Sequence, residues 1–170
     1  MDRGLVHLYW GEGKGKTTAA VGLALRALGS GLRVTLVQFL KDGQSSELEP
    51  LRNLGAAVYT GESRTKFVFQ MTPEEKIALK AQHDALLRQA LEAPCDLLIL
   101  DEACAACRMN MVDEAMLRRS VLERPLRREV VLTGREPAHW MLEAADYSTE
   151  MTCHRHPYQN SIAARKGVEF

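Results

Sequence analysis

The stretch Gly11-Glu12-Gly13-Lys14-Gly15-Lys16-Thr17-Thr18 stands directly after a short apolar segment, residues 5–10. Gly15-Lys16-Thr17 matches the Gly-Lys-Ser/Thr end of the P-loop pattern, and Gly11 and Gly13 keep the loop rich in glycine, although the first glycine of the general pattern would fall at Trp10. From Lys16 onward apolar residues recur at the spacing of a helix, until glycines at positions 29 and 31 supply a stop. A strand, a glycine-rich turn and a helix in this order predict a loop that binds the triphosphate of ATP.

Each residue type in this loop suits that task. Glycines let the backbone curl so that its N–H groups point at phosphate oxygens, and the start of the helix adds a positive end. Lys16 is placed to reach the terminal phosphates, and the hydroxyl of Thr17 to ligate Mg²⁺. The residues predicted to bind the triphosphate are Gly11, Glu12, Gly13, Lys14, Gly15, Lys16, Thr17 and Thr18.

Strand and helix patterns alternate along the rest of the chain. Further strands are expected over residues 34–40, 57–59, 96–102, 129–133 and 146–151. Helices are expected over residues 47–54, 73–92, 113–123 and 137–145, with loops at 41–46 and 61–66 and an irregular tail from 153. The helix at 73 has the clearest start, because Thr72-Pro73-Glu74-Glu75 is a capping box with proline in the first turn.

This alternation predicts an α/β fold. We expect one domain over residues 1–170, P-loop NTPase-like (RecA-like), with a mainly parallel central sheet flanked by helices. The order of the strands in the sheet cannot be read from the pattern.

Composition narrows the classes of partner. The 22 basic and 22 acidic residues cancel, so no global field favours nucleic acid or an anionic membrane. The chain has no signal-peptide layout at its start, and no apolar stretch approaches the roughly 18 residues that span a bilayer. The four cysteines are interpreted as reduced thiols, and a cytoplasmic protein is expected.

A pair of acids ends the apolar strand before position 101. A P-loop needs a carboxylate at the end of a neighbouring buried strand to hold or orient Mg²⁺, and Asp101-Glu102 stands there. Thr17, Asp101 and Glu102 are therefore the predicted metal-site residues. The alternative is that the pair only caps a helix or lies in a solvated turn.

Two further motifs are weaker. Arg135 follows the strand that ends at Thr133-Gly134, at the edge where ligands of open α/β sheets bind, so it is a candidate for a phosphate contact or merely an arginine on a solvated loop. Cys104 and Cys107, with Cys153 and the nearby histidines, have only half the spacing of a zinc site. They equally suit small apolar side chains that pack after the acid pair.

Together these pieces resemble the P-loop family of ATP:corrinoid adenosyltransferases over nearly the whole chain. The motifs that carry the resemblance occur in order: Gly13-Lys14-Gly15-Lys16-Thr17-Thr18-Ala19-Ala20, Val37-Gln38-Phe39-Leu40-Lys41, Leu100-Asp101-Glu102, Leu132-Thr133-Gly134-Arg135, Ala144-Ala145-Asp146 and Ala163-Ala164-Arg165-Lys166-Gly167-Val168-Glu169-Phe170. The departures are Glu12, where many members have Asn, and Ser161 and Arg165, where Gly and Gln are usual.

The resemblance implies that Co(I) of a corrinoid attacks C5′ of ATP and that triphosphate leaves. It implies catalytic roles for Lys16 and Glu102, with Lys41 and Arg135 as further ligands of ATP or its triphosphate. Mg²⁺ is the implied metal. The implied partners are ATP, a corrinoid, a flavoprotein electron donor and a second copy in a homodimer, with no nucleic acid and no membrane.

The resemblance also points to an aromatic cover for the lower face of the corrinoid. Many members carry a Phe/Trp pair for this purpose, and here the equivalent stretch is Lys66-Phe67-Val68-Phe69-Gln70. In an extended segment the rings of Phe67 and Phe69 would point to the same side. The alternative is that both rings pack as core beneath the helix that begins after Thr72.

Two other functions stay open on the sequence. One is a P-loop ATPase or kinase in which Glu102 activates water or a hydroxyl, and which would release ADP rather than triphosphate. The other is a non-catalytic module that binds ATP and reports its state to a partner through residues 41–70.

Overall fold

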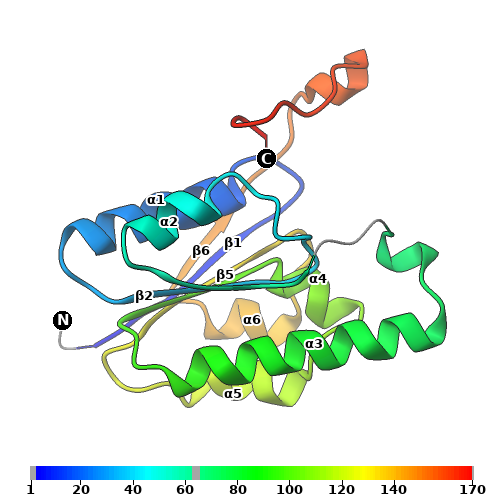
Figure 1. Ribbon diagram of the computed structural model, residues 1–170. Helices are drawn as coiled ribbons and strands as arrows, with labels where there is room; N and C mark the ends of the chain where they lie inside the picture. Colours follow the sequence, from blue (N-terminus) through cyan, green and yellow to red (C-terminus); the bar gives the residue numbers. More distant parts are fainter. Residues whose placement is uncertain (1–2, 63–65, 170) are drawn as a thin grey trace.

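Six parallel strands form one sheet in the order β3-β2-β4-β5-β1-β6 in the computed structural model, which describes residues 3–62 and 66–169 (Figure 1). The strands are β1 Val6–Trp10, β2 Val34–Gln38, β3 Ala57–Thr60, β4 Leu97–Asp101, β5 Glu129–Gly134 and β6 Tyr147–Glu150. The predicted parallel α/β sheet is confirmed, and it is consistent with a RecA-like P-loop fold.

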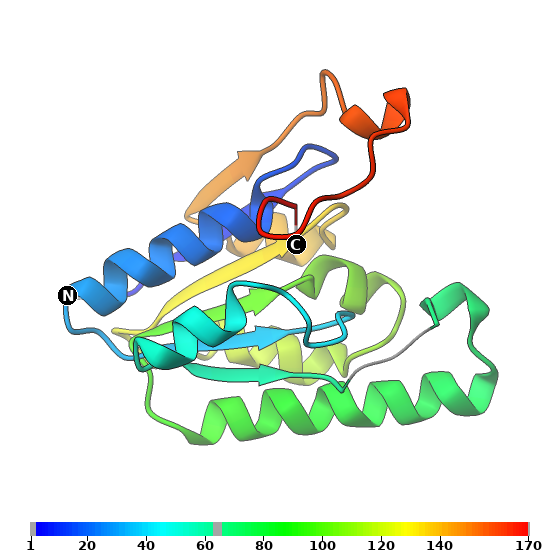
Figure 2. The same cartoon turned by 45° about the horizontal axis from the view of Figure 1, so that its top comes forward.

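Helices cover both faces of this sheet. The helices α1 and α2 lie on one face, and α3 to α6 lie on the other (Figures 1 and 2). Their bounds are α1 Lys16–Gly29, α2 Leu48–Asn53, α3 Pro73–Glu92, α4 Ala103–Arg108, α5 Glu114–Leu122 and α6 His139–Ala144, with short 3₁₀ helices η1 Val68–Gln70 and η2 Pro157–Asn160. None of the helices in the described residues is both long and apolar enough to cross a membrane.

Alternation along the buried strands builds a separate core on each face. On β4, Leu98 and Leu100 belong to the core beneath α3 to α6, whereas Leu97 and Ile99 belong to the core beneath α1 and α2. The buried residues of α1 are all alanines, which let the helix lie close to the sheet. Because the strands are parallel, the carboxyl ends of β1, β2, β4 and β5 lie at the same edge of the sheet.

The predicted elements are confirmed apart from three differences. The helix α4 was not expected, and the strand predicted over 34–40 ends at Gln38 as β2. The segment of Phe67 is not extended throughout, because it turns into η1. Residues 63–65 of the loop expected at 61–66, and residues 1–2 and 170 at the ends of the expected domain, lie outside the described residues.

Candidate functional site

The residues predicted to carry chemistry meet at the carboxyl edge of the sheet. In the strand register Trp10 lies opposite Gly134, and Gln38 lies opposite Asp101. The loop after β1, the acids after β4 and Arg135 after β5 therefore share this edge. The strand β5 lies between β1 and β4, so the P-loop and the acid pair approach each other across it.

The P-loop has the curled backbone that its glycines predict. Gly15 takes a φ of 119° at the start of α1, a conformation that a residue with a Cβ rarely adopts. Gly13 lies so close to the chain after β6 that a Cβ there would be 2.6 Å from the carbonyl oxygen of Met151. The N–H of Gly13 donates to that same oxygen at 2.6 Å, so β6 supports the loop from behind.

Lys16 is folded onto its own loop. Its Nζ donates to the carbonyl oxygen of Gly13 at 2.6 Å. Burial lowers the pKa of this lysine from its ordinary value, because the charged form loses water. A phosphate oxygen at the loop would offer Lys16 a charged acceptor in place of a neutral one, which is a stronger hydrogen bond.

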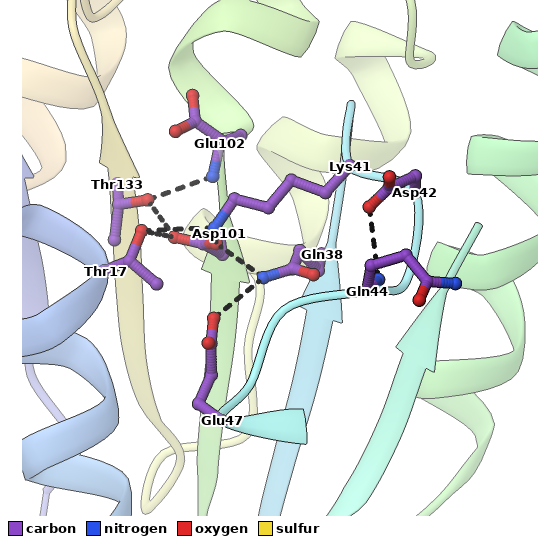
Figure 3. A network of polar contacts seen from close by, with 9 residues as sticks. All are labelled: Thr17, Gln38, Lys41, Asp42, Gln44, Glu47, Asp101, Glu102 and Thr133. Carbon is purple, nitrogen blue, oxygen red and sulfur yellow. Dashed lines mark hydrogen bonds and ion pairs between the residues drawn. The ribbon is translucent and has the colours of Figure 1, made fainter. Parts of the chain in front are cut away.

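Asp101 is the centre of a hydrogen-bond network (Figure 3). Its Oδ1 accepts from the hydroxyls of Thr17 at 2.8 Å and Thr133 at 2.7 Å. Its Oδ2 accepts from Lys41 Nζ at 2.8 Å and from Gln38 Nε2 at 3.1 Å. The residue is fully buried. Both oxygens are thus occupied, and the carboxylate fixes the hydroxyl that the P-loop pattern assigns to the metal.

The charge of Asp101 is kept despite its burial. Burial alone would raise the pKa of this carboxyl, but the ammonium of Lys41 and the hydrogen bonds of the two threonines outweigh it and hold the pKa below its usual value. The network therefore contains the negative charge of Asp101 next to the positive charge of Lys41. Lys41 Nζ is also 3.5 Å from Thr17 Oγ1.

Glu102 differs from Asp101 in backbone conformation, in the partners of its carboxylate and in the direction of its pKa shift. It adopts a left-handed conformation, with φ of 59°, at the start of α4, and its N–H donates to Thr133 Oγ1 at 2.9 Å. Its carboxylate points away from the network (Figure 3) and makes no hydrogen bond or ion pair with the residues that the structure describes. Burial raises the pKa of Glu102, and the charge of Asp101 adds to the rise.

This donor set fits Mg²⁺, which takes few protein ligands and keeps waters and phosphate oxygens. The Thr17 hydroxyl and the unpaired carboxylate of Glu102 are oxygen donors of the preferred kind. Asp101 fits better as the partner of Thr17 than as a direct ligand, because four donors already fill its oxygens.

Arg135 and Glu12 form an ion pair beside the P-loop, outside the lining of the cavity described below, with Arg135 Nη1 3.0 Å from Glu12 Oε2. Both side chains are well exposed, so the pair is a weak one. Lys14 and Thr18 of the same loop are also exposed. These predicted phosphate ligands are thus accessible at the loop or next to it.

A cavity of about 940 Å³ opens beside the P-loop and the network. The C-terminal tail forms one wall, close to the start of α1 (Figure 2). The lining residues are Thr17, Thr18, Val21, Leu40, Lys41, Asp42, Gln44, Ser45, Ser46, Glu47, Lys66, Phe67, Ala164, Gly167, Val168 and Glu169. The walls combine polar groups from the network with apolar surface.

The two phenylalanines at the rim are exposed and stacked on each other. Phe67 is 68% exposed and Phe69 is 80% exposed. Their ring centroids are 5.6 Å apart with planes 5° from parallel. The alternative that both rings pack as core beneath α3 is therefore wrong. Phe67 lines the cavity, whereas Phe69 lies outside its lining. The two rings stack across the turn of η1 rather than along an extended strand.

Comparison with known proteins agrees with this site. Residues 2–170 match the family described as ATP:corrinoid adenosyltransferase BtuR/CobO/CobP. The chain belongs to the ATP:corrinoid adenosyltransferase family. It is 33% identical over 172 residues to the corrinoid adenosyltransferase of Pseudomonas aeruginosa, covering 99% of this chain and 85% of that protein.

Two other members of the ATP:corrinoid adenosyltransferase family are similar over almost the same extent. The corrinoid adenosyltransferase of a Sinorhizobium species is 33% identical over 177 residues, with 99% of this chain and 81% of that protein covered. The corrinoid adenosyltransferase of Escherichia coli K12 is 29% identical over 173 residues, with 99% and 87% covered. The match therefore includes the P-loop, the acid pair and the tail.

Sequence reasoning missed several residues of this adenosyltransferase-family site. Gln38 and Thr133 complete the network around Asp101, and each is a polar residue at the carboxyl end of an apolar strand, which is a signal that was available. Glu47 faces the cavity and accepts from Gln38 Nε2 at 3.3 Å. Met151 supports the P-loop through its backbone, and no sequence pattern marks such a contact.

The four cysteines are free thiols, as predicted. Cys104 and Cys107 lie on α4 and pack into the core, which agrees with their interpretation as small apolar side chains. Burial raises the pKa of the Cys104 thiol to about 12, so this group stays protonated at neutral pH. Cys104 also packs closely against Gly134, because a Cβ added to Gly134 would lie only 2.4 Å from the Cβ of Cys104.

Proposed function

We propose that this protein transfers the 5′-deoxyadenosyl group of ATP to the Co(I) of a corrinoid, with release of triphosphate, in adenosylcobalamin synthesis. The observation that carries the proposal is the joining of a P-loop and its Asp101 network to one cavity with an exposed aromatic pair at its rim. Membership of the adenosyltransferase family supports it.

The triphosphate is the leaving group, and the loop provides its charge complement. Lys16 turns from Gly13 to the phosphates, and the loop N–H groups and the start of α1 add their positive ends. Lys41 and Arg135 are the further cations at this edge. Thr17 and Glu102 would hold Mg²⁺, which supplies additional positive charge to the triphosphate, and Asp101 orients Thr17.

The chemical step is a displacement at carbon. A cobalt–carbon bond forms as the electron pair of Co(I) attacks C5′, and the C5′–oxygen bond breaks with its pair going to the triphosphate. The electronic demands fall on the corrinoid. The protein holds C5′ and cobalt in line, and alignment of two reactants is worth about 7–11 kcal/mol.

The aromatic pair is proposed to cover the lower face of the corrinoid. Phe67 belongs to the cavity wall and Phe69 stacks on it from outside, so the pair can present one flat apolar surface. Exclusion of the lower axial ligand by such a surface makes Co(II) easier to reduce. Exposure of two large apolar rings is otherwise unfavourable, which supports a ligand as their partner.

The rival functions differ in their products. A kinase or ATPase that uses Glu102 would release ADP, and a module that only binds ATP would release nothing. Neither rival accounts for the stacked phenylalanines beside the triphosphate site. The homodimer, the flavoprotein electron donor, the cytoplasmic location and the single domain over residues 1–170 stay predictions.

One assay tests the proposal. The protein is incubated with ATP, Mg²⁺ and chemically reduced corrinoid, and the cobalt–carbon product is followed by absorbance while triphosphate and ADP are separated by ion exchange. Product with equimolar triphosphate is expected. Lys16→Ala should nearly abolish transfer in a folded protein, whereas the matched control Lys76→Ala on α3 should not. ADP as the main product would show the kinase or ATPase function instead.

A further inference from the structure

The turn that follows β2 contains a residue in a conformation that needs outside support. Leu40 has a φ of 56°, in the left-handed region that a branched side chain such as leucine rarely occupies. Lys41 comes next, and its Nζ reaches Asp101 Oδ2 at 2.8 Å and Thr17 Oγ1 at 3.5 Å. Figure 3 shows the Lys41 side chain directed at Asp101, and because Lys41 directly follows Leu40, the backbone conformation of Leu40 affects where that side chain points.

His83 of α3 is the side chain that contacts this turn. It is 1% exposed, and its Nε2 lies 3.2 Å from the backbone nitrogen of Leu40. Its Nδ1 lies 2.8 Å from the carbonyl oxygen of Met111, in the loop between α4 and α5. The ring of Phe39 packs edge-on against it, with centroids 5.4 Å apart.

These two contacts define the tautomer of His83. The N–H of Leu40 can only donate, so Nε2 must be the acceptor and Nδ1 must carry the hydrogen. The carbonyl of Met111 can only accept, so Nδ1 donates to it. The imidazole is therefore neutral and joins two loops, one of which ends in the triphosphate site.

We propose that His83 is a positioning residue for the transfer reaction. By accepting from the Leu40 N–H it holds the left-handed turn that aims Lys41 at Asp101 and Thr17, and it thereby sets the affinity for the triphosphate of ATP. The proposal rests on the function proposed above for Lys41. His83 itself touches neither ATP nor the corrinoid, since it is buried beneath β2 on the opposite face from α1.

The simpler interpretation is that His83 only fills the core and ties α3 to the loop at Met111. The two interpretations separate because the two nitrogens act on different loops. Glutamine places its amide near the position of Nε2, and asparagine places its amide near the position of Nδ1. His83→Gln thus keeps an acceptor for Leu40, whereas His83→Asn keeps a donor for Met111 and loses Leu40.

The experiment compares these two variants with the wild-type protein. The measurements are KM for ATP and kcat with pre-formed Co(I) corrinoid, ATP affinity by titration calorimetry, and melting temperature. We expect His83→Asn to raise KM for ATP about tenfold, as loss of one buried hydrogen bond would. His83→Gln should stay within about threefold of wild type, although both variants lose one buried hydrogen bond and melt at similar lowered temperatures.

A double-mutant cycle shows whether the effect passes through Lys41. In a Lys41→Met background, His83→Asn should raise KM for ATP no further, because the side chain that it positions has gone. Equal KM values for the Asn and Gln variants, or a full additional effect of His83→Asn in the Lys41→Met background, would overturn the proposal.

A second pair of variants acts on the turn itself and keeps the test valid if neither His83 variant folds. Leu40→Val adds a branch at Cβ that penalises the left-handed conformation, and Leu40→Met is the volume-matched control without that branch. Because Leu40 also lines the cavity, the two variants are compared with each other: Leu40→Val should raise KM for ATP more than Leu40→Met does, and equal values would contradict the proposal. Calorimetry measures ATP affinity even if no cobalt–carbon product forms. Failure of the proposed transferase function can therefore be distinguished from failure of the proposal for His83.

Discussion

Asp101 keeps a negative charge in a place that water does not reach. This charge is stabilised by four donors, from α1, β2, β5 and the turn after β2, and Lys41 of that turn is the charged one among them. Removal of one partner from a buried ion pair leaves an uncompensated charge, which is more harmful than removal of both. At the scale of single residues, the site is therefore part of the folded state as well as of the reaction.

We predict that Lys41→Met lowers the free energy of unfolding at neutral pH by about 3 kcal/mol, the low end of the range for a broken buried pair, because three neutral donors remain. Since the pKa of Asp101 is lowered by folding, its stabilisation is present at neutral pH and lost as pH falls through the folded pKa. The variant should therefore lose less stability on acidification than wild type.

Urea unfolding at neutral and acidic pH checks this, with Lys41→Arg as the control that keeps the charge. An unchanged stability of Lys41→Met at neutral pH would show that Asp101 does not need the ammonium.

Glu102 leads to the opposite prediction for stability. Its pKa is raised by burial, so its charge opposes folding above the unfolded pKa, and stability rises as pH falls through the folded pKa. Glu102→Gln should be at least as stable as wild type at neutral pH and should not gain stability in mild acid. Transfer should fall by at least about tenfold, as expected when one charged hydrogen-bonding group of a site is removed, with partial rescue by excess Mg²⁺.

Activity against Mg²⁺ concentration and thermal melts at several pH values check the Glu102 prediction. If excess Mg²⁺ rescues nothing and ATP affinity is unchanged, the acid is structural.

Sequence spacing was sufficient to place those residues that belong to a backbone motif, whereas their roles stay predictions. Lys16, Thr17 and Asp101 could be predicted because a P-loop and the end of a buried strand define their places. Gln38 and Thr133 could not be assigned with the same force, since a polar residue at a strand end has many possible partners. His83 gave no signal, because its ring nitrogens contact backbone groups of loops distant in sequence.

At the scale of elements, local chemistry decided which helices could be predicted. The helix α3 begins at Pro73, and the Thr72 side chain accepts from the Glu75 N–H, as the capping box indicates. The helix α4 has no such start, because its first turn follows Glu102 in a left-handed conformation without a side-chain cap. Six residues between an acid pair and a turn are too short for periodicity to show.

A single short element, η1, places both rings of the aromatic pair. Phe67→Ala and Phe69→Ala should change the free energy of unfolding by no more than about 0.5 kcal/mol, since both rings are exposed. Either change should severely reduce transfer that starts from Co(II) and a weak reductant. The loss with pre-formed Co(I) should be much smaller, and Phe67→Ala should be the more severe because Phe67 lines the cavity.

Parallel assays with the two cobalt states, and melting curves for each variant, test the aromatic pair. Equal losses in both assays that follow a lowered melting temperature would rule out the corrinoid cover.

For the molecule as a whole, the C-terminal tail forms one wall of the cavity. Ala164 and residues 167–169 line it, although the tail is almost wholly exposed. Deletion of residues 162–170 should therefore leave the melting temperature nearly unchanged. It should raise KM for ATP about tenfold, equal to about 1.4 kcal/mol of binding free energy.

Tyr158→Ala is the matched control for this deletion, because Tyr158 is an exposed residue of the same tail outside the cavity lining. Steady-state kinetics on both proteins provide the measurement. A deletion variant with wild-type KM values would show that the tail only rests against the site.

The order of the strands was beyond sequence reasoning, because it is set by pairings between distant segments rather than by local pattern. Val6 of β1 pairs with Val130 of β5, whereas β2 follows β1 along the chain and lies three places away in the sheet.

These strand pairings determine when β1 can find its partners during synthesis on the ribosome. The strand that leads into the P-loop is synthesised before its two neighbours in the sheet, β5 and β6, and three other strands are synthesised between them. A nascent chain shorter than about residue 134 offers β1 no partner on either side. The triphosphate site thus becomes complete only after β5 has been synthesised, and translation products that end before β5 should not bind ATP.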